Sequence, residues 1–385
     1  MTRLRLVKVM PFFAPATQFG GVVTQAEKVC RLLAARGHSI RVVTTDNGVD
    51  PAVSRAKWVD RDDYQVYYAQ TRAWHRIPPY WSPTMAPALE EALADADVCA
   101  LNVGLTMTNH LAAKIAQRNG VPYVYNAEGA LCPTRLWIKR RRKRIFLKRI
   151  ERPLLANATA FQAVTHKEIG DLVGQSVVDH MNLIPNGVEP FIPGDEATFR
   201  SRFDIGQDEQ LVLFLGRLHA VKGLDLLVEA FVKAALPNTR LVIAGHDEDG
   251  TGRRIASQVK AFGLDDRFVF TGHLEADARR DALTAADLFV LTSDSEGLPN
   301  AVLEALAAGV PCLLTPMCNV PEVEEAAAGR VTEGSSEAVA TALHELLSDP
   351  TGLARMGENA RTLAGNKFDL SRVVDQLEAL YQSIR

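Results

Sequence analysis

The sequence has few cysteines, and none of them form a pair of the kind that binds zinc. There are five in 385 residues, an odd number, and no two have C-x-x-C spacing: Cys30, Cys99, Cys132, Cys312 and Cys318. Neither a zinc ribbon nor a disulfide framework is therefore indicated. We expect buried, reduced thiols.

Long apolar runs and a strong excess of one charge are also missing. The longest apolar stretches have the length of a strand, and residues 1–10 alternate charged with aliphatic side chains instead of forming a signal-peptide core. We therefore expect a cytoplasmic protein without a membrane span. The formal net charge of −3 argues against nucleic acid as the main partner.

The chain is long enough for two domains. Its 385 residues exceed the roughly 250–300 at which a single hydrophobic core stops growing. Hydrophobic residues make up 47% of the sequence, which is sufficient for two cores.

Strand and helix patterns alternate along the whole chain. A buried strand is predicted at residues 4–10 and, after a loop rich in proline and glycine, a helix at 22–35. Further strands are predicted at 40–45, 97–101, 122–125, 160–164, 182–184, 211–215, 240–244, 268–270, 288–291 and 311–314. This alternation predicts an α/β fold with mostly parallel sheets covered on both faces.

Turn residues concentrate at residues 185–193, where we place the domain boundary. The predicted N-terminal domain is 1–188 and the C-terminal domain is 189–368. The last helical stretch, 369–385, is expected to pack back on the first domain.

Two cations follow the strand predicted at 211–215. Arg217 and Lys222 lie between Gly216 and Gly223, on a loop at the carboxyl end of that strand. Ligands of open α/β sheets bind at this edge, and an arginine and a lysine can hold a diphosphate there. The alternative is a pair of solvated surface charges.

Two carboxylates flank the start of another predicted helix. Pro299 suits the first turn of a helix that Gly309 ends, so Glu304 lies inside the helix and Glu296 lies on the loop before it. Both can reach a ligand across the helix N-terminus, which favours a phosphate. The alternative is two exposed acids around a helix start.

Taken in order, these segments resemble glycosyltransferase family 4. The segments that match are Phe19-Gly-Gly-Val, the Arg217/Lys222 loop, the Glu296-x7-Glu304 segment and the closing helix, which together span nearly the whole chain. The resemblance implies a retaining glycosyltransferase of the GT-B fold, in which two Rossmann-like domains have parallel sheets that face each other across a cleft.

The resemblance also implies roles for individual residues. Arg217 and Lys222 would bind the donor diphosphate, Glu296 the hydroxyls of the transferred sugar and Glu304 the nucleotide ribose. Further donor contacts would come from Gly20, Gly21, Gly216, Gly297, Leu298 and Asn300. The glycine pair alone is a weak signal, because loops need glycine anyway.

No metal or other cofactor is expected. In retaining transfer, as the resemblance implies it, the acceptor hydroxyl attacks the face from which the nucleoside diphosphate departs. Arg217, Lys222 and helix amides can stabilise that leaving group without a metal. Asp247, Glu248 and Asp249 have the acidic D-x-D form of some metal sites, but they lie in a charged loop and are interpreted as solvated surface.

One residue departs from the family pattern. Many relatives have a histidine before a glycine after a strand of the first domain, whereas this sequence has Glu128 before Gly129. A carboxylate can accept a proton or a hydrogen bond from a hydroxyl, but it cannot act as a neutral donor and acceptor as imidazole does. Glu128 is therefore a candidate catalytic residue.

A basic stretch is the strongest local charge anomaly. Residues 137–152 combine a helical pattern with many cations, including Lys139, Arg140, Arg141, Arg142, Lys143 and Arg144. Such a helix fits an anionic membrane surface or an anionic acceptor, and its alternative is a solvated face. We expect peripheral association with the inner face of a membrane.

The leading hypothesis is a retaining hexosyltransferase that uses a UDP- or GDP-sugar and a glycan or lipid-linked acceptor, in assembly of a cell-surface polysaccharide or glycolipid. One alternative is a sugar-phosphate synthase of the same fold. Another is a catalytically silent nucleotide-sugar-binding or membrane-adaptor protein. Nucleic-acid binding is the least favoured, because aromatic residues are sparse in the basic stretch.

Overall fold

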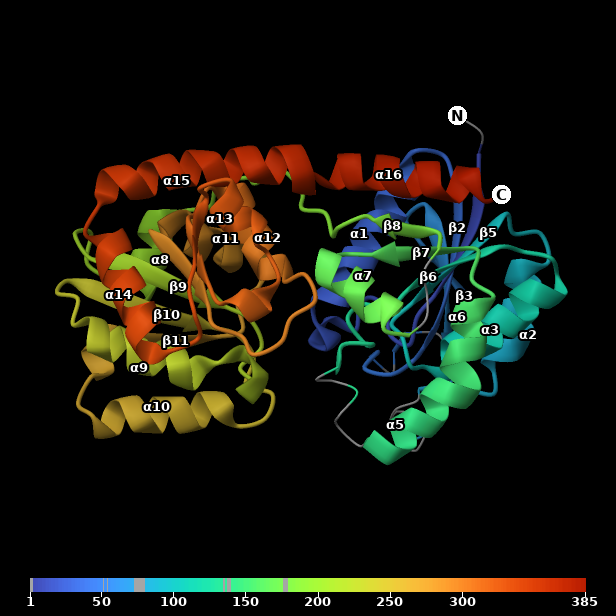
Figure 1. Cartoon of the computed structure of the whole chain (residues 1–385), viewed down its shortest axis with the longest axis horizontal. Coiled ribbons are helices and arrows are strands. Elements are labelled where there is room, and N and C mark those ends of the chain that lie inside the picture. Colours follow the sequence, from blue (N-terminus) through green and yellow to red (C-terminus); the bar gives the residue numbers. More distant parts are fainter. Residues whose placement is uncertain are drawn as a thin grey trace. The chain divides into compact units, whose positions relative to one another are not determined.

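The computed structural model describes residues 3–385 except 51, 54, 73–79, 134–135, 137–139 and 176–178, and leaves out the side chains of 140–142. Figure 1 shows the elements in chain order, coloured from the N- to the C-terminus. They form two compact units, one made of residues 1–187 and 370–385 and the other of residues 188–369.

The first unit contains an eight-stranded sheet in the order β3-β4-β2-β1-β5-β6-β7-β8. All neighbouring strands are parallel except β3 and β4, which are antiparallel. The strands are β1 Arg5–Val9, β2 Ser39–Thr45, β3 Trp58–Arg61, β4 Tyr64–Ala69, β5 Val98–Asn102, β6 Tyr123–Asn126, β7 Ala160–Ala163 and β8 Met181–Leu183.

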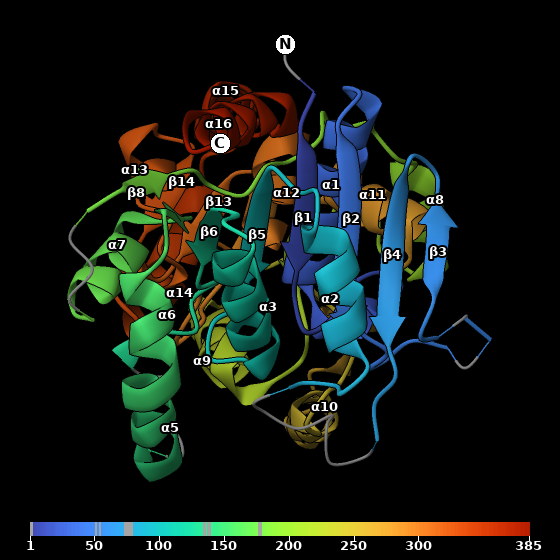
Figure 2. The same cartoon turned by 90° about the vertical axis from the view of Figure 1, so that its right-hand side faces the viewer.

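Helices cover both faces of this sheet. One face packs on α1 (Gly21–Ala35) and the C-terminal helix α16 (Leu370–Ser383). The other face packs on α2 (Met85–Leu93), α3 (Met107–Arg118) and α6 (Arg152–Ala156) (Figure 2). The remaining helices described in this unit are η1 Thr17–Phe19, α5 Arg140–Phe146, the π-helix Leu147–Glu151 and α7 His166–Val173.

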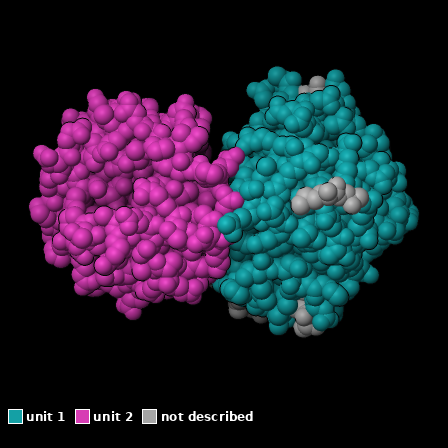
Figure 3. Space-filling model, turned by 90° about the horizontal axis from the view of Figure 1, so that it is seen from above, with its two compact units in different colours: residues 1–187, 370–385 teal, residues 188–369 magenta. Residues whose placement is uncertain are grey.

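Figure 3 colours the residues of the two units differently. The second unit is built around a six-stranded sheet in the order β11-β10-β9-β12-β13-β14, with every pair parallel. Its strands are β9 Gln210–Leu215, β10 Thr239–Ala244, β11 Phe268–Gly272, β12 Leu288–Leu291, β13 Cys312–Leu314 and β14 Gly329–Val331. Its α-helices are α8 Glu196–Arg202, α9 Leu224–Ala234, α10 Thr251–Ala261, α11 Ala276–Ala285, α12 Asn300–Ala308, α13 Glu322–Glu325, α14 Ser336–Leu347 and α15 Pro350–Leu363. Strands such as β9 are apolar along almost their whole length because both faces of a parallel sheet are buried.

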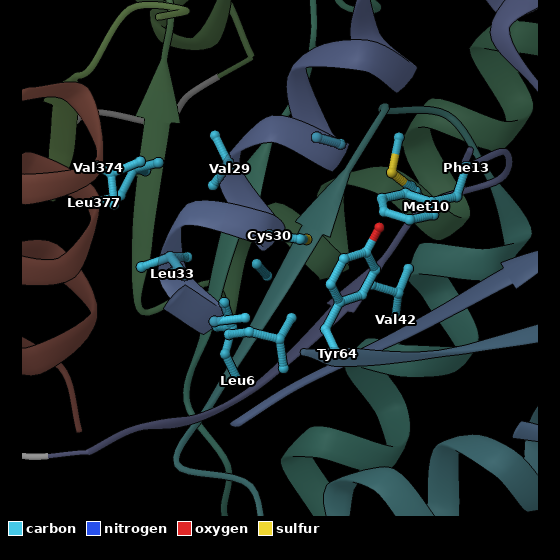
Figure 4. Close-up of a cluster of buried hydrophobic side chains, with 14 of the residues drawn as sticks. Leu6, Met10, Phe13, Val29, Cys30, Leu33, Val42, Tyr64, Val374 and Leu377 are labelled. Atoms are coloured by element: carbon cyan, nitrogen blue, oxygen red, sulfur yellow. The ribbon is translucent and has the colours of Figure 1, made fainter. Parts of the chain in front are cut away.

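The C-terminal helix contributes to the core of the first unit. Val374 and Leu377 of α16 are buried in the same cluster as Val29 and Leu33 of α1 (Figure 4). Along α16 the buried residues recur at three- and four-residue intervals, as expected for one apolar face. The last helix therefore belongs to the fold of the unit that begins the chain.

The predicted α/β class with two parallel-sheet domains is confirmed, as are the buried, free cysteines. Strands β3, β4 and β14 were not predicted from the sequence. Within the described residues, none of the helices combines the length and the apolar character needed to cross a bilayer.

Candidate functional site

The loop after β9 is held against the end of β12 by a glycine. Gly223 has φ +65, and a Cβ at this position would lie 2.0 Å from the carbonyl oxygen of Thr292. The Thr292 hydroxyl in turn donates to the Gly223 carbonyl at 2.9 Å. This close packing fixes Lys222, the residue before Gly223, at the carboxyl edge of the second unit's sheet.

Lys222 and Glu296 meet at this edge, although 74 residues separate them. Lys222 Nζ lies 2.6 Å from Glu296 Oε1, and the Ser293 hydroxyl donates to the same oxygen at 2.6 Å. The two side chains are only 14% and 10% exposed. The alternative of an exposed acid is therefore wrong for Glu296.

The backbone of Glu296 is fixed from both sides. Its N–H donates to the Met317 carbonyl at 3.0 Å, and its carbonyl accepts from Asn319 Nδ2 at 2.6 Å. Its carboxylate is therefore presented from a rigid loop.

Helix α12 begins next to this pair. Pro299 is its N-cap, no side chain caps the helix, and no acidic residue lies in its first turn. The space beside Gly297 is open, because a Cβ at this position would meet no atom within 4 Å. Gly309 ends the helix with φ +79, as predicted. A helix start without an acid in its first turn favours a bound anion.

Glu304 lies inside α12 and faces an arginine of α11. Arg279 Nη2 approaches Glu304 Oε2 at 2.6 Å, but without hydrogen-bond geometry, so this buried oxygen accepts no hydrogen bond among the described residues. The Glu304 side chain is 24% exposed. Glu304 Oε2 is thus ion-paired with Arg279 but accepts no hydrogen bond among the described residues.

Arg217 lies on the same loop as Lys222 but has a different partner. Its Nη1 pairs with Glu248 Oε2 at 2.6 Å, and both side chains are about two-fifths exposed. Exposed ion pairs contribute only about 0–1 kcal/mol, so an anionic ligand could draw Arg217 away at low cost.

The acidic D-x-D segment caps backbone rather than lying free in solvent. Asp247 accepts from the N–H groups of Gly250, Gly252 and Arg253. Asp249 accepts from Thr251 and from Ala220, which is in the Lys222 loop. These hydrogen bonds, the one with the Thr251 side chain foremost, lower the pKa of Asp249 to about 2. Asp249 thus helps to fix the Lys222 loop, a role that the sequence analysis missed.

Within the part of the chain that the structure describes, there is no group of three or more histidine, cysteine or acidic side chains arranged to hold a metal ion.

In the first unit, the glycine pair lies where β1 leads into α1. Gly20 has φ +85 and is the N-cap of α1, and Gly21 is its first residue. No side chain caps this helix and no acid lies in its first turn. The pair therefore begins another helix that has no side-chain cap, at the carboxyl edge of a sheet.

Glu128 follows β6 at the same edge of that sheet. It has the left-handed φ of +51, and its Oε1 accepts from Asn102 Nδ2 and Asn126 Nδ2, each at 3.2 Å. Burial, with added repulsion from Glu168, raises the pKa of Glu128 to about 7, while Lys8 opposes the rise. Glu128 is therefore a half-buried carboxylate that titrates near neutral pH.

Glu168 holds the loop that carries Glu128. It is buried, and its two oxygens accept from the N–H groups of Gly129 at 2.7 Å and Val164 at 2.8 Å. The sequence analysis missed Glu168, and it also missed Lys8, Asn102 and Asn126. The sequence features that could have indicated these residues are a lysine and an asparagine within buried strands.

Within the basic stretch, residues 140–146 form helix α5 of the first unit, which projects away from the sheet in Figures 1 and 2. Arg144 is exposed, Lys143 is half-buried and Ile145 is 60% exposed. Lys139 lies outside the described residues, and of Arg140, Arg141 and Arg142 the structure describes only the backbone.

The predicted single helix is interrupted by a π-helix at Leu147–Glu151. A π-helix turn contains one residue more than an α-helix turn, and here it ends at the buried Glu151. Glu151 Oε1 accepts from Leu105 N at 3.0 Å and from the Tyr125 hydroxyl.

Two family models match the chain. Residues 195–363 match "Glycosyl transferases group 1", and residues 20–187 match "Glycosyl transferase 4-like domain".

Several curated proteins are similar over part of the chain. N-acetyl-alpha-D-glucosaminyl L-malate synthase of Bacillus anthracis is 28% identical over 49% of this chain and 50% of its own length. Mannosylfructose-phosphate synthase of Agrobacterium fabrum is 34% identical over 44% of this chain and 37% of its own. A GDP-mannose-dependent monoacylated alpha-(1-6)-phosphatidylinositol monomannoside mannosyltransferase of Corynebacterium glutamicum is 31% identical over 52% and 55%. The chain thus spans about half the length of these relatives.

Solved structures share the fold over the full chain. Sucrose-phosphate synthase from Thermosynechococcus elongatus has a TM-score of 0.78 at 20% identity and covers 99% of both chains. Anabaena Alr3699/HepE, solved with UDP and glucose, has a TM-score of 0.77 at 17% identity and covers 99% of this chain and 100% of its own. At these identities the similarity shows the fold alone.

Proposed function

Because this chain belongs to the group 1 glycosyl transferases and has the GT-B fold, we propose that it transfers a hexose-type sugar from a nucleotide-sugar donor to a hydroxyl acceptor, with retention of anomeric configuration. The observation that carries the proposal is the Lys222–Glu296 pair beside the bare start of α12. It combines a cation, a carboxylate and a helix N-terminus without a side-chain cap at one sheet edge, which suits a sugar diphosphate.

In this proposal the second unit binds the donor. Lys222, Arg217 and the start of α12 bind the diphosphate, with Gly216, Gly297, Leu298 and Asn300 lining its approach. The open side at Gly297 is compatible with close approach of a ligand. Glu296 accepts hydrogen bonds from the transferred sugar, and the partly exposed Glu304 carboxylate accepts one from the ribose.

The same groups assist departure of the leaving group. Negative charge develops on the diphosphate as the bond to the anomeric carbon breaks. Lys222 and the α12 amides are already in place to stabilise that charge, and loss of one such preorganised donor costs roughly 10²–10³-fold in rate. The proposed reaction needs no metal or other cofactor.

The first unit supplies the acceptor side. Gly20 and Gly21 allow a ligand to approach the start of α1, and Glu128 is a carboxylate that can accept a proton or a hydrogen bond from a hydroxyl. Glu128 is accordingly proposed to take the place of the histidine found in many relatives.

We assign the basic helix α5 to an anionic membrane surface. Exposed Arg144 and Ile145 are adjacent on it, a combination of charge and apolar contact typical of interfacial helices. One relative is named as acting on a phosphatidylinositol mannoside, which supports a lipid-linked acceptor. The protein would then work in cell-surface glycan or glycolipid assembly, in the cytoplasm at the inner face of the membrane.

Flotation with anionic vesicles tests the membrane assignment. Wild type should float, and an Arg144→Glu/Lys148→Glu variant should float less, because each basic residue near an anionic surface contributes about 1 kcal/mol. Absence of wild-type binding would exclude this assignment and leave the rest of the proposal standing.

A second candidate is a sugar-phosphate synthase. It is supported by similarity to mannosylfructose-phosphate synthase. Transfer to a soluble phosphorylated sugar, with no transfer to lipid-linked acceptors, would select this candidate.

The central experiment is a thermal-shift screen against UDP, GDP, ADP and their sugar conjugates. A ligand at 100 times its Kd adds about 2.7 kcal/mol of stability. One nucleotide series should stabilise the wild type, whereas Arg217→Ala and Glu304→Ala should lose most of the shift. Glu358→Ala, which removes an exposed acid of α15, is the control and should keep it. No shift for the wild type with any nucleotide would contradict donor binding and favour a protein without this activity.

A further inference from the structure

A lysine of α7 contacts a thiol in the loop that follows β6. Lys167 Nζ donates a hydrogen bond to Cys132 Sγ at 3.1 Å, and the same nitrogen lies 3.2 Å from Asp171 Oδ2, one helical turn further along α7. A cation therefore lies between a sulfur and a carboxylate. We call these three side chains the Cys132–Lys167 cluster, and the proposed function does not use them.

Backbone hydrogen bonds hold both ends of this contact in place. Glu168, the residue after Lys167, accepts from the N–H groups of Gly129 at 2.7 Å and Val164 at 2.8 Å. The Cys132 N–H in turn donates to the Gly129 carbonyl at 3.3 Å. Because the loop and α7 are joined next to the cluster, the fold itself brings Lys167 to Cys132.

The charges of the cluster favour a thiolate. Burial lowers the pKa of Lys167, but the hydrogen bond with Cys132 and the charge of Asp171 outweigh burial, so that the pKa is raised. Lys167 is therefore an ammonium at neutral pH. A cation in contact with a cysteine sulfur stabilises the thiolate, which is the nucleophilic form.

The other four cysteines have the opposite character. Cys312 and Cys318 donate their S–H groups to backbone carbonyls, at 3.6 Å and 3.2 Å. Burial raises the pKa of all four thiols, to about 11 for Cys30 and Cys318, and it also raises that of Cys99. These four thiols keep their protons at neutral pH, so they serve as internal controls for Cys132.

The cluster is open to water at its lysine. The Lys167 side chain is 34% exposed and that of Asp171 is 12% exposed, whereas Cys132 itself is buried. An oxidant of about the size of water can therefore approach the pair where Lys167 meets the solvent.

We propose that Cys132 is a site of oxidation by hydrogen peroxide, and that its oxidised sulfur forms a covalent S–N bond, a sulfenamide, with Lys167. The bond joins the loop that carries Glu128 to α7. This inference goes beyond the proposed function and does not rest on it, because it concerns a reaction of the protein's own side chains.

The reaction balances with hydrogen peroxide as the oxidant. The thiolate attacks one peroxide oxygen, so that an S–O bond forms, the O–O bond breaks and hydroxide leaves; the sulfur is oxidised and the peroxide is reduced. The hydroxide takes a proton from the Lys167 ammonium and becomes water. The resulting amine attacks the sulfenic sulfur, the S–N bond forms, the S–O bond breaks, and the departing hydroxide takes the second proton from the nitrogen as another water.

Peptide mass spectrometry of the full chain after treatment with hydrogen peroxide tests the proposal. We expect a pair of peptides joined through Cys132 and Lys167, about 2 Da lighter than the two reduced peptides together, because two hydrogens are lost. Dithiothreitol should separate the pair. The other four cysteines should remain reduced, and iodoacetamide should alkylate them after unfolding.

Two variants separate the charge of Lys167 from its nucleophilic nitrogen. Lys167→Arg keeps the cation but has no amine, so Cys132 should be oxidised at close to the wild-type rate to a sulfenic acid that dimedone traps, without the link. Lys167→Met should slow the oxidation of Cys132 by about five-fold or more, because the thiolate loses its counter-charge. Lys114→Met, which removes an exposed lysine of α3, is the matched control and should behave as the wild type.

Three results would overturn the proposal. Cys132 could be oxidised no faster than the other cysteines, or its oxidised form could be a sulfinic acid or a disulfide and never be joined to Lys167. Oxidation of Cys132 in Lys167→Met at the wild-type rate would show that the cation has no effect on the sulfur. None of these results depends on nucleotide binding, so failure of this inference and failure of the proposed function are distinguishable.

Discussion

Two glycines have the same backbone angle in different surroundings. Gly223 and Gly263 both have φ +65, but a Cβ at Gly223 would meet Thr292, whereas one at Gly263 would meet nothing within 4 Å. An alanine in the left-handed region costs about 1–2 kcal/mol by itself. We predict that Gly263→Ala loses about that much stability and that Gly223→Ala loses clearly more, together with nucleotide binding. Urea unfolding measures both, and equal losses would show that the Thr292 contact does not constrain the loop.

The raised pKa of Glu128 predicts a dependence of stability on pH. Burial is the main cause of the rise from 4.5 to about 7. The folded state therefore binds a proton that the unfolded state has lost, so this contribution is largest below pH 4.5 and is lost as the pH rises through 7. Each pKa unit corresponds to about 1.4 kcal/mol.

Glu128→Gln should remove this contribution. The free energy of unfolding of the wild type, relative to the variant, should fall between pH 5 and pH 8 in urea titrations. Taking the difference cancels Glu151, whose pKa burial also raises. A difference that is constant across this range would mean that Glu128 titrates like an exposed acid.

The candidate site could be predicted from the sequence only in part. Lys222 and Glu296 were found as separate candidates, because each follows a recognisable strand or precedes a helix. Their pairing depends on the packing of β9 beside β12, which no local pattern encodes. Lys8 was missed because a single lysine in an apolar strand does not reveal which face it lies on or what it meets there.

At the scale of elements, most strands were predicted, and two of the three that were missed, β3 and β14, lie at sheet edges. The third, β4, is internal and mostly buried, and the edge strands β8 and β11 were predicted. Strand β1 is buried after its first residue, whereas β3, at one edge, has no buried residue and contains Asp60 and Arg61. The edge strand β14 has only three residues. An edge strand is partly solvated and needs no apolar run, so the sequences of β3 and β14 could not be told from loops.

Helix α16 has a buried face and an exposed face, which substitutions can compare. Leu377 is 3% exposed in the first unit's core, whereas its neighbour Gln376 is exposed. Leu377→Ala should lower the stability of this unit by about 2–5 kcal/mol, because it leaves a cavity in a packed core. Gln376→Ala should change it by less than about 0.5 kcal/mol. Similar losses from both variants in denaturant unfolding would mean that α16 does not pack as described.

The whole molecule has two cores on one chain. The first unit ends at Gly187 and resumes at Leu370, so the second unit is an insertion within it. Each unit has its own sheet, covered by its own helices, and multidomain proteins commonly depart from two-state unfolding. Stability is therefore expected to be a property of each unit rather than of the chain.

Calorimetry of the intact protein should accordingly show two unfolding transitions. Leu377→Ala should lower only the transition of the first unit, and this assigns it. The nucleotide that binds should raise only the other transition, by about 2.7 kcal/mol at 100 times its Kd, because Lys222, Glu296 and Glu304 all belong to the second unit. If Leu377→Ala and the nucleotide both moved one common transition, the two cores would unfold together, and the stability of the donor-binding groups would depend on the C-terminal helix.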